Sequence, residues 1–218
     1  MIVAIDGPAG SGKSAVGRRL AARLKLPFVD SGLFYRLLAC AAQKRGLGEG
    51  APDRVRLEQL ASTLSFELSG SRLAAGGDDF TASVYSPQTS AFTSAIASFA
   101  EVRAALLPQQ RRLATGGVVM AGRDIGTVVL PEADFKFFLT ASTAERVRRR
   151  ARQLEARGEQ VDPAVLTEEV VGRDRQDSER EVAPLRAAAD AQVIETDHLG
   201  VDQVVDLMYR RVSSGASA

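Results

Sequence analysis

The strongest constraint on this chain is a glycine-rich stretch that joins an apolar run to a helical pattern. The stretch matches G-x-x-x-x-G-K-[ST] and consists of Gly7, Pro8, Ala9, Gly10, Ser11, Gly12, Lys13 and Ser14. It follows the apolar residues 2–5 and precedes Val16, Leu20 and Leu24, which recur at four-residue helical spacing. This context predicts a P-loop, whose backbone N–H groups surround phosphates at a helix N-terminus. The alternative, a plain glycine-rich turn, requires neither flank.

The polar residues of this motif predict particular contacts with a nucleotide. Lys13 is expected to reach the β- and γ-phosphates, and the Ser14 hydroxyl to ligate Mg²⁺, partly through water. A GTPase would need an asparagine in its guanine-specificity motif, and the chain has no asparagine. A motor protein should be longer than 218 residues. The remaining class is phosphoryl transfer to a small acceptor, which needs converging cations and a closing lid that excludes water.

Short apolar runs alternate with helical patterns along most of the chain. The strand candidates are residues 2–5, 27–29, 117–120, 135–139 and 192–194. Short, continuously apolar strands separated by helices indicate a five-stranded parallel sheet with helices on both faces, an α/β fold. The last helix is expected to bury Val201, Val204, Val205 and Met208, which recur at helical spacing.

Two segments depart from this rhythm. Residues 64–86 combine short apolar runs with turns, Gly70 among them, and predict an antiparallel insertion of two or three strands. Residues 146–180 hold nine of the 24 arginines and predict a mobile helical hairpin. Its first helix starts at Ser142, with Glu145 completing a capping box, and its second at Asp162. Residues 213–217 are expected to lack regular structure.

The charge composition narrows the class of protein. The chain has 28 basic and 27 acidic residues, and a net charge of +1 excludes a polyanion binder that relies on a bulk positive field. The bases comprise 24 Arg and four Lys; genomic base composition is one explanation, and bidentate phosphate binding by arginine is the other. A single Cys and a single His exclude a disulfide framework and multi-histidine metal centres. No apolar run is long enough to span a membrane, so we expect a soluble cytoplasmic protein.

Three further polar segments are candidates for an acceptor site. Residues 30–36 follow the second strand and residues 122–127 the third, at strand ends where α/β proteins bind ligands. Arg173, Asp177 and Arg180 share one helix face at spacings of four and three residues. The alternatives are a helix cap with a solvated arginine for the first two segments, and an exposed ladder of ion pairs for the third.

Together these segments resemble bacterial cytidylate kinases of the P-loop nucleoside monophosphate kinase superfamily. The matching pieces are DGPAGSGKS at 6–14, DSGLFYR at 30–36, GRDIGTVV at 122–129, RDRQDSER at 173–180, VAPL at 182–185 and AAD at 188–190. The resemblance covers almost the whole chain, and the second and third motifs are more specific to the family than the P-loop. It implies transfer of the ATP γ-phosphate to CMP or dCMP, with Mg²⁺ and by direct in-line transfer.

The resemblance also implies roles for individual residues. Residues implied to bind CMP are Ser31, Arg36, Ser94, Arg103, Arg123, Asp124, Arg173, Asp177 and Arg180. Besides the P-loop residues, those implied to bind ATP are Ala15, Arg146 and Arg150. The catalytic cations are implied to be Lys13, Arg123, Arg149 and Arg180. For the hydroxyl that contacts the cytosine, Thr93 and Ser98 remain alternatives to Ser94.

The resemblance implies one kinase domain over residues 1–218. Its core would comprise about 1–36, 101–145 and 181–212, its monophosphate-binding insertion about 37–100, and its lid about 146–180. Three positions depart from the family pattern: Ala121 replaces an Asp, Ala15 replaces a commoner Thr, and residues 83–86 lack an Arg. Rival predictions are a kinase for UMP, AMP or shikimate, or a non-catalytic regulator. The expected state is a monomer that binds small molecules, without nucleic acid or membrane.

Overall fold

The computed structural model describes residues 1–69, 72–156, 158 and 162–215. The chain forms two compact units, each described by itself. The first comprises Met1–Val29 with Ala114–Ala218, and the second comprises Asp30–Leu113. Gly70, expected in a turn of the insertion, lies outside the described residues.

The first unit is built on the predicted sheet of five strands. The strand order is β2-β6-β1-β7-β8, and the registers of β1 with β6, β1 with β7 and β7 with β8 are parallel. The strands are β1 (Ile2–Asp6), β2 (Phe28–Asp30), β6 (Val118–Ala121), β7 (Phe135–Thr140) and β8 (Gln192–Glu195). The α/β prediction is confirmed. The physical reason is that short, continuously apolar strands are shielded from water only when helices cover both faces of their sheet.

Helices α1 (Lys13–Leu24) and α8 (Val201–Gly215) pack on this sheet and on each other. Leu20 of α1 and Met208 of α8 are fully buried in the same apolar cluster as Ile5 and Phe137. The expectation of an irregular tail from residue 213 is wrong as far as Gly215, where α8 still lies against Phe135. Residues 216–217 of that expectation lie outside the described part of the chain.

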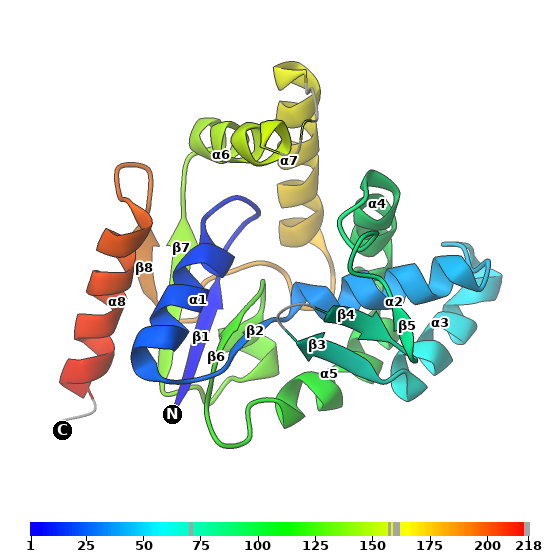
Figure 1. Cartoon of the computed structure of the whole chain (residues 1–218), viewed down its shortest axis with the longest axis horizontal. Helices are drawn as coiled ribbons and strands as arrows, with labels where there is room; N and C mark the ends of the chain where they lie inside the picture. Colours follow the sequence, from blue (N-terminus) through cyan, green and yellow to red (C-terminus); the bar gives the residue numbers. More distant parts are fainter. Residues whose placement is uncertain (70–71, 157, 159–161, 216–218) are drawn as a thin grey trace. The chain divides into compact units, whose positions relative to one another are not determined.

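The predicted charged hairpin consists of α6 (Thr143–Glu155) and α7 (Pro163–Glu179). Ser142 caps α6 by accepting the N–H of Glu145, and Asp162 caps α7 by accepting the N–H of Ala164, so both predicted starts are confirmed. The hairpin buries Leu154, Leu166 and Val170. Figure 1 shows α6 directly beyond β7, on the side of the sheet where the P-loop follows β1.

A five-residue π-helix, η1 (Ile125–Val129), follows β6. Its wide turn places the carbonyl of Asp124 against the N–H groups of both Val128 and Val129, at 2.9 and 3.1 Å. Nothing in the sequence pattern predicted this element. π-Helical turns are rare and occur frequently at functional sites.

The second unit contains the predicted antiparallel insertion. Its sheet has the order β3-β4-β5, formed by β3 (Phe66–Ser69), β4 (Arg72–Ala75) and β5 (Asp78–Asp79). Its helices are α2 (Gly32–Lys44), α3 (Ala51–Thr63), α4 (Pro87–Ile96) and α5 (Ala100–Arg112). In the described ranges no single helix has the length and apolarity to cross a membrane. Helices α4 and α5 together meet that criterion by length and composition, with a bend of 99° at their break.

Candidate active site

The P-loop adopts a backbone that glycine alone tolerates at its turning points. Gly7 has φ +146°, and a Cβ there would lie 2.1 Å from the carbonyl oxygen of Leu139. Gly10 has φ +78°, and its Cβ would meet the Cβ of Arg146 at 3.0 Å. Each position has both a positive φ and no room for a Cβ. The fold therefore requires glycine at both.

Lys13 is the first residue of α1 and is almost fully buried. Its ammonium donates to the carbonyl of Pro8 at 2.6 Å and to the hydroxyl of Ser11 at 3.4 Å. The side chain therefore curls back across the loop and places a positive charge inside it. Ser14 follows Lys13 in the first turn of α1, where the helix dipole adds positive potential.

Asp6, at the end of β1, joins the P-loop to the segment after β6. Its two carboxylate oxygens accept the N–H groups of Ile125 and Gly126, each at 2.7 Å, so it caps η1. The pKa of Asp6 is raised to about 6, mainly by burial and also by the charge of Asp124. The N–H groups of Gly126 and Ile125 and the charge of Lys13 act in the opposite direction.

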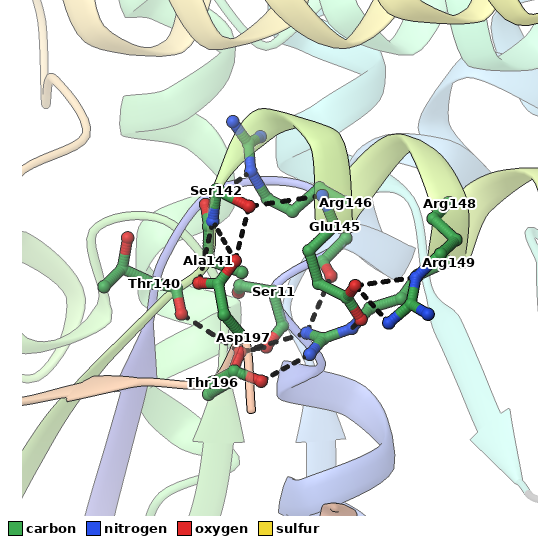
Figure 2. Close-up of polar contacts among 11 residues, drawn as sticks. Ser11, Thr140, Ala141, Ser142, Glu145, Arg146, Arg148, Arg149, Thr196 and Asp197 are labelled. Atoms are coloured by element: carbon green, nitrogen blue, oxygen red, sulfur yellow. Dashed lines mark hydrogen bonds and ion pairs between the residues drawn. The ribbon is translucent and has the colours of Figure 1, made fainter. Parts of the chain in front are cut away.

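Arg149 of α6 braces the P-loop from the side of β8 (Figure 2). Its guanidinium donates to the carbonyl of Gly10 at 3.4 Å and to the carbonyl and hydroxyl of Thr196 at 2.6 and 3.0 Å. Its Nε pairs with Glu145 at 2.8 Å. The Thr196 hydroxyl in turn donates to the carbonyl of Thr140 at 3.0 Å. Arg149, which was predicted to be a catalytic cation, is thus held beside the P-loop by Glu145 of its own helix and by Thr196 after β8.

Arg146, one turn earlier on α6, is more deeply buried than Arg149. It donates to the carbonyls of Ala141 and Ala9 at 3.0 and 3.2 Å and pairs with Asp174 of α7 at 2.6 Å. Arg150, also assigned to ATP by the sequence, lies on α6 and is half-buried. Arg146 and Arg149 therefore bind neighbouring carbonyls of the P-loop, at positions 9 and 10.

A second cluster of charges surrounds Asp177 of α7. Arg123 donates to its carboxylate at 2.8 Å, and Arg180 lies 3.7 Å from it and 3.6 Å from Asp124. Burial would raise the pKa of Asp177, but the charges of Arg123, Arg173 and Arg180 and the hydrogen bond from Arg123 hold it below its ordinary value. Since Arg180 and Asp177 are 5% and 16% exposed, the alternative of a solvated ion-pair ladder is wrong here.

The second unit holds the remaining residues that the resemblance assigned to CMP. Ser31 is the buried N-cap of α2, and Arg36 donates to the carbonyl of Val84 and the hydroxyl of Ser90 at 3.1 and 3.0 Å. Arg36 also lies over the ring of Tyr85, in the segment where the family pattern has an arginine.

Arg103 and the candidate hydroxyls belong to α4 and α5 and the link between them. Arg103 is buried, donates to the carbonyl of Ala97 at 3.0 Å and lies over the ring of Tyr35. All three hydroxyls donate to carbonyls of the preceding turn, but Thr93 is buried whereas Ser94 and Ser98 are half-buried.

Comparison with known proteins assigns the chain to a family. Residues 3–214 match the family model described as Cytidylate kinase. The chain belongs to the cytidylate kinase family. The cytidylate kinase of Pelotomaculum thermopropionicum is 43% identical over 98% of this chain and 96% of its own length. The cytidylate kinase of Methylococcus capsulatus is 44% identical over 98% and 97%. The predicted resemblance is confirmed.

Some other matches to this cytidylate kinase family member are partial or show the fold alone. The bifunctional pantoate ligase/cytidylate kinase of Synechococcus elongatus is 45% identical over 96% of this chain but only 41% of its own length, so the chain spans about two fifths of that relative. Shikimate kinase from Bacteroides thetaiotaomicron has a TM-score of 0.50 at 12% identity over 98% of both chains. An uncharacterized protein from Eubacterium ventriosum reaches 0.55 at 14% identity over 98% and 99%.

No site role was predicted from the sequence for several polar residues beside this kinase-family P-loop. They are Asp6, Glu145, Asp174, Thr196 and Asp197. Asp197 accepts both the N–H and the hydroxyl of Ser142, so it takes the place that the predicted capping box gave to Glu145 (Figure 2). Only the position of Asp6, at the end of a strand and next to the motif, was a usable signal. The others come close to the loop only through the fold.

Proposed function

We propose that the chain transfers the γ-phosphate of ATP to CMP or dCMP, giving the diphosphate and ADP. The observation that carries this proposal is the family match over residues 3–214, which includes the P-loop and every assigned acceptor residue. The confirmed P-loop geometry favours a nucleoside triphosphate as the donor, because its glycines, Lys13 and helix N-terminus all favour phosphate.

The donor site would consist of the P-loop with Ala15 and two lid arginines. Gly7, Gly10 and Gly12 all have positive φ, which allows the loop to curl around phosphate groups. The hydroxyl of Ser14 and the carboxylate of Asp6, which interacts with Lys13, are oxygen ligands of the kind that Mg²⁺ prefers, so the residues present fit this ion. When bound, Mg²⁺ would neutralise charge on the transferring phosphates. Ser14 would hold it, partly through water.

Each unit holds residues that we assign to the acceptor. In the second unit these are Ser31, Arg36, Ser94 and Arg103, with Arg36 assigned to the CMP phosphate. In the first unit we assign Arg123 to a phosphate contact and Asp124 to the cytosine. Arg173 and Asp177 would hold the sugar hydroxyls, and Arg180 the phosphates. The pairing of Arg123 and Arg180 with Asp177 supports this assignment, since it holds two guanidinium groups beside one carboxylate.

The reaction needs positioning and charge neutralisation rather than a strong base. The nucleophile is an oxygen of the acceptor phosphate, so direct in-line transfer requires no phosphoenzyme. Lys13, Arg149, Arg123 and Arg180 would stabilise the charge of the transferring group. We also propose the division into a core, an insertion over about 37–100 and a lid over about 146–180. Monomeric action in the cytoplasm, without nucleic acid or membrane, stays a prediction.

One assay tests the proposed substrates. ADP release is measured by a coupled reaction with CMP, dCMP, UMP and AMP as acceptors, each with ATP and Mg²⁺. We expect CMP and dCMP to support the highest kcat/KM. Faster turnover of UMP or AMP would favour the rival monophosphate kinases. ATP binding without acceptor-stimulated ADP release would favour a non-catalytic regulator.

Replacing the P-loop lysine tests the mechanism. Lys13→Ala is expected to lower kcat with CMP roughly 10²- to 10³-fold, the cost of losing one charge-stabilising contact. The exposed Lys25→Ala variant is the control, because Lys25 caps the far end of α1. Full turnover by Lys13→Ala would contradict the mechanism.

A further inference from the structure

Arg146 uses its guanidinium almost entirely within the protein. Its side chain is 6% exposed, and its Nε and Nη1 donate to the carbonyls of Ala141 and Ala9. Its Nη2 donates to the hydroxyl of Thr143 at 3.2 Å and pairs with Asp174 at 2.6 Å. These contacts join the end of β7, the P-loop and α7 through one planar group.

The Arg146–Asp174 pair is the strongest of these links. Asp174 is about three-quarters buried, and a buried charge-assisted bond is shorter and stronger than a neutral one. Breaking such a pair from one side leaves an uncompensated charge. The ion pair of Arg175 with Glu179, on the same helix, is exposed on both sides and should contribute little.

The position of Asp174 on α7 connects the Arg146–Asp174 pair to the proposed acceptor residues. Arg173, its neighbour in sequence, and Asp177, three residues later, are the residues proposed to hold the acceptor sugar. Asp177 is tied separately to Arg123, in the segment after β6. Helix α7 is therefore held at two successive points, toward the P-loop at Asp174 and toward the Gly-Arg-Asp segment at Asp177.

We propose that Arg146 and Asp174 are positioning residues that set the place of α7, and with it Arg173 and Asp177, relative to the P-loop. This inference rests on the proposed function. It gives Arg146 an action through protein groups, in addition to the ATP contact proposed above. The pair links donor and acceptor machinery within the first unit, so its loss should affect the acceptor more than the donor.

The larger expected effect on the acceptor than on the donor follows from the contacts that remain in the variant. In Asp174→Ala, Arg146 keeps its bonds to the carbonyls of Ala9 and Ala141, so the P-loop keeps its brace. Helix α7 loses its link to that loop. We expect the KM for CMP to rise about tenfold while the KM for ATP changes less than twofold, a coupling of ordinary size for a buried pair.

Glu179→Ala is the matched control, because it removes the same charge from the same helix. We expect its two KM values to stay within twofold of wild type. Asp174→Asn keeps an oxygen that can accept from Arg146, so it should restore most of the lost acceptor binding. Arg146→Lys loses the planar guanidinium that pairs with Asp174. Adding Asp174→Ala to this variant should therefore raise the KM for CMP by less than a further twofold. Circular dichroism and thermal melts confirm folding; if Asp174→Ala does not fold, Arg146→Lys carries the test through its KM for CMP.

Two results would overturn the inference. One is a KM for CMP in Asp174→Ala and Arg146→Lys equal to that of Glu179→Ala. The other is an equal rise in both KM values, which indicates general loosening. If wild type does not phosphorylate CMP, the proposed function fails, and the link is judged by amide hydrogen exchange. Exchange in α7 should then rise in Asp174→Ala and not in Glu179→Ala; equal exchange in both would overturn the link.

Discussion

The arginines of this chain have different roles, and their exposure to solvent distinguishes these roles. Arg175 of α7 is 75% exposed and pairs with Glu179 on the same surface, a contact typical of a solvated helix face. Arg146, Arg149 and Arg180 instead donate to backbone carbonyls. The near-neutral total hides a local concentration of cations beside the P-loop and Asp177.

The pH dependence of stability should report on Asp6. Its pKa is raised to about 6 from an ordinary value of 3.8. Between about pH 4 and 6 the folded protein holds a proton that the unfolded chain has released, so acidification through this window stabilises the fold. This contribution is absent above pH 6, where Asp6 is ionised in both states and its burial opposes folding.

Asp6→Asn removes this titration. We expect the free energy of unfolding of wild type, relative to Asp6→Asn, to rise by roughly 1 to 3 kcal/mol from pH 7 to pH 4. Urea denaturation at several pH values measures the difference. A constant difference across the window would show that the N–H groups of Ile125 and Gly126 fully offset the effect of burial.

At the scale of elements, the start of α6 was predicted correctly, but one of the two contacts behind that prediction has a different partner. Ser142 accepts the N–H of Glu145, as a capping box requires, but its own N–H donates to Asp197. Glu145 is instead paired with Arg148 and Arg149. The helix start follows from local chemistry, whereas the partner of the cap comes from the loop after β8.

Ser142→Ala tests this junction. The variant loses the N-cap acceptor and the hydroxyl bond to Asp197, so we expect the free energy of unfolding to fall by about 1 kcal/mol or somewhat more. Ser62→Ala is the control, since Ser62 is exposed on α3 and its hydroxyl bonds only to Glu58 of its own helix. Thermal or urea unfolding of both variants provides the measurement. Equal stability of the two would contradict a role for the cap.

Elements differ in how far the sequence predicts them. The strands of the parallel sheet and the helices α1 and α8 follow from apolar patterning, because they contribute side chains to the same core. The π-helix η1 does not, since its first N–H groups depend on the carboxylate of Asp6, more than a hundred residues earlier. The end of α8 was likewise beyond local signals, because contact with Phe135 accompanies the extra turn to Gly215.

At the scale of the whole molecule, the core of the first unit joins strands and helices from both ends of the chain. Leu20→Ala should lower the free energy of unfolding by about 2 to 5 kcal/mol, because the residue is fully buried between α1 and the sheet. Leu207→Ala is the control, since Leu207 lies on α8 and is exposed. Urea denaturation compares the two. A similar small loss in both would contradict the assignment of Leu20 to the core.

The sequence by itself determined the P-loop, the parallel sheet, the antiparallel insertion and the family, because these depend on local spacing and on the alternation of apolar runs. It also identified Arg123, Asp177 and Arg180 as candidates. Only the tertiary structure decided the partners: Asp6 with η1, Arg149 with Thr196, and Arg146 with Asp174. The physical reason is that local propensity acts within a few residues, whereas a buried charge selects its partner from whatever the fold brings within hydrogen-bond distance.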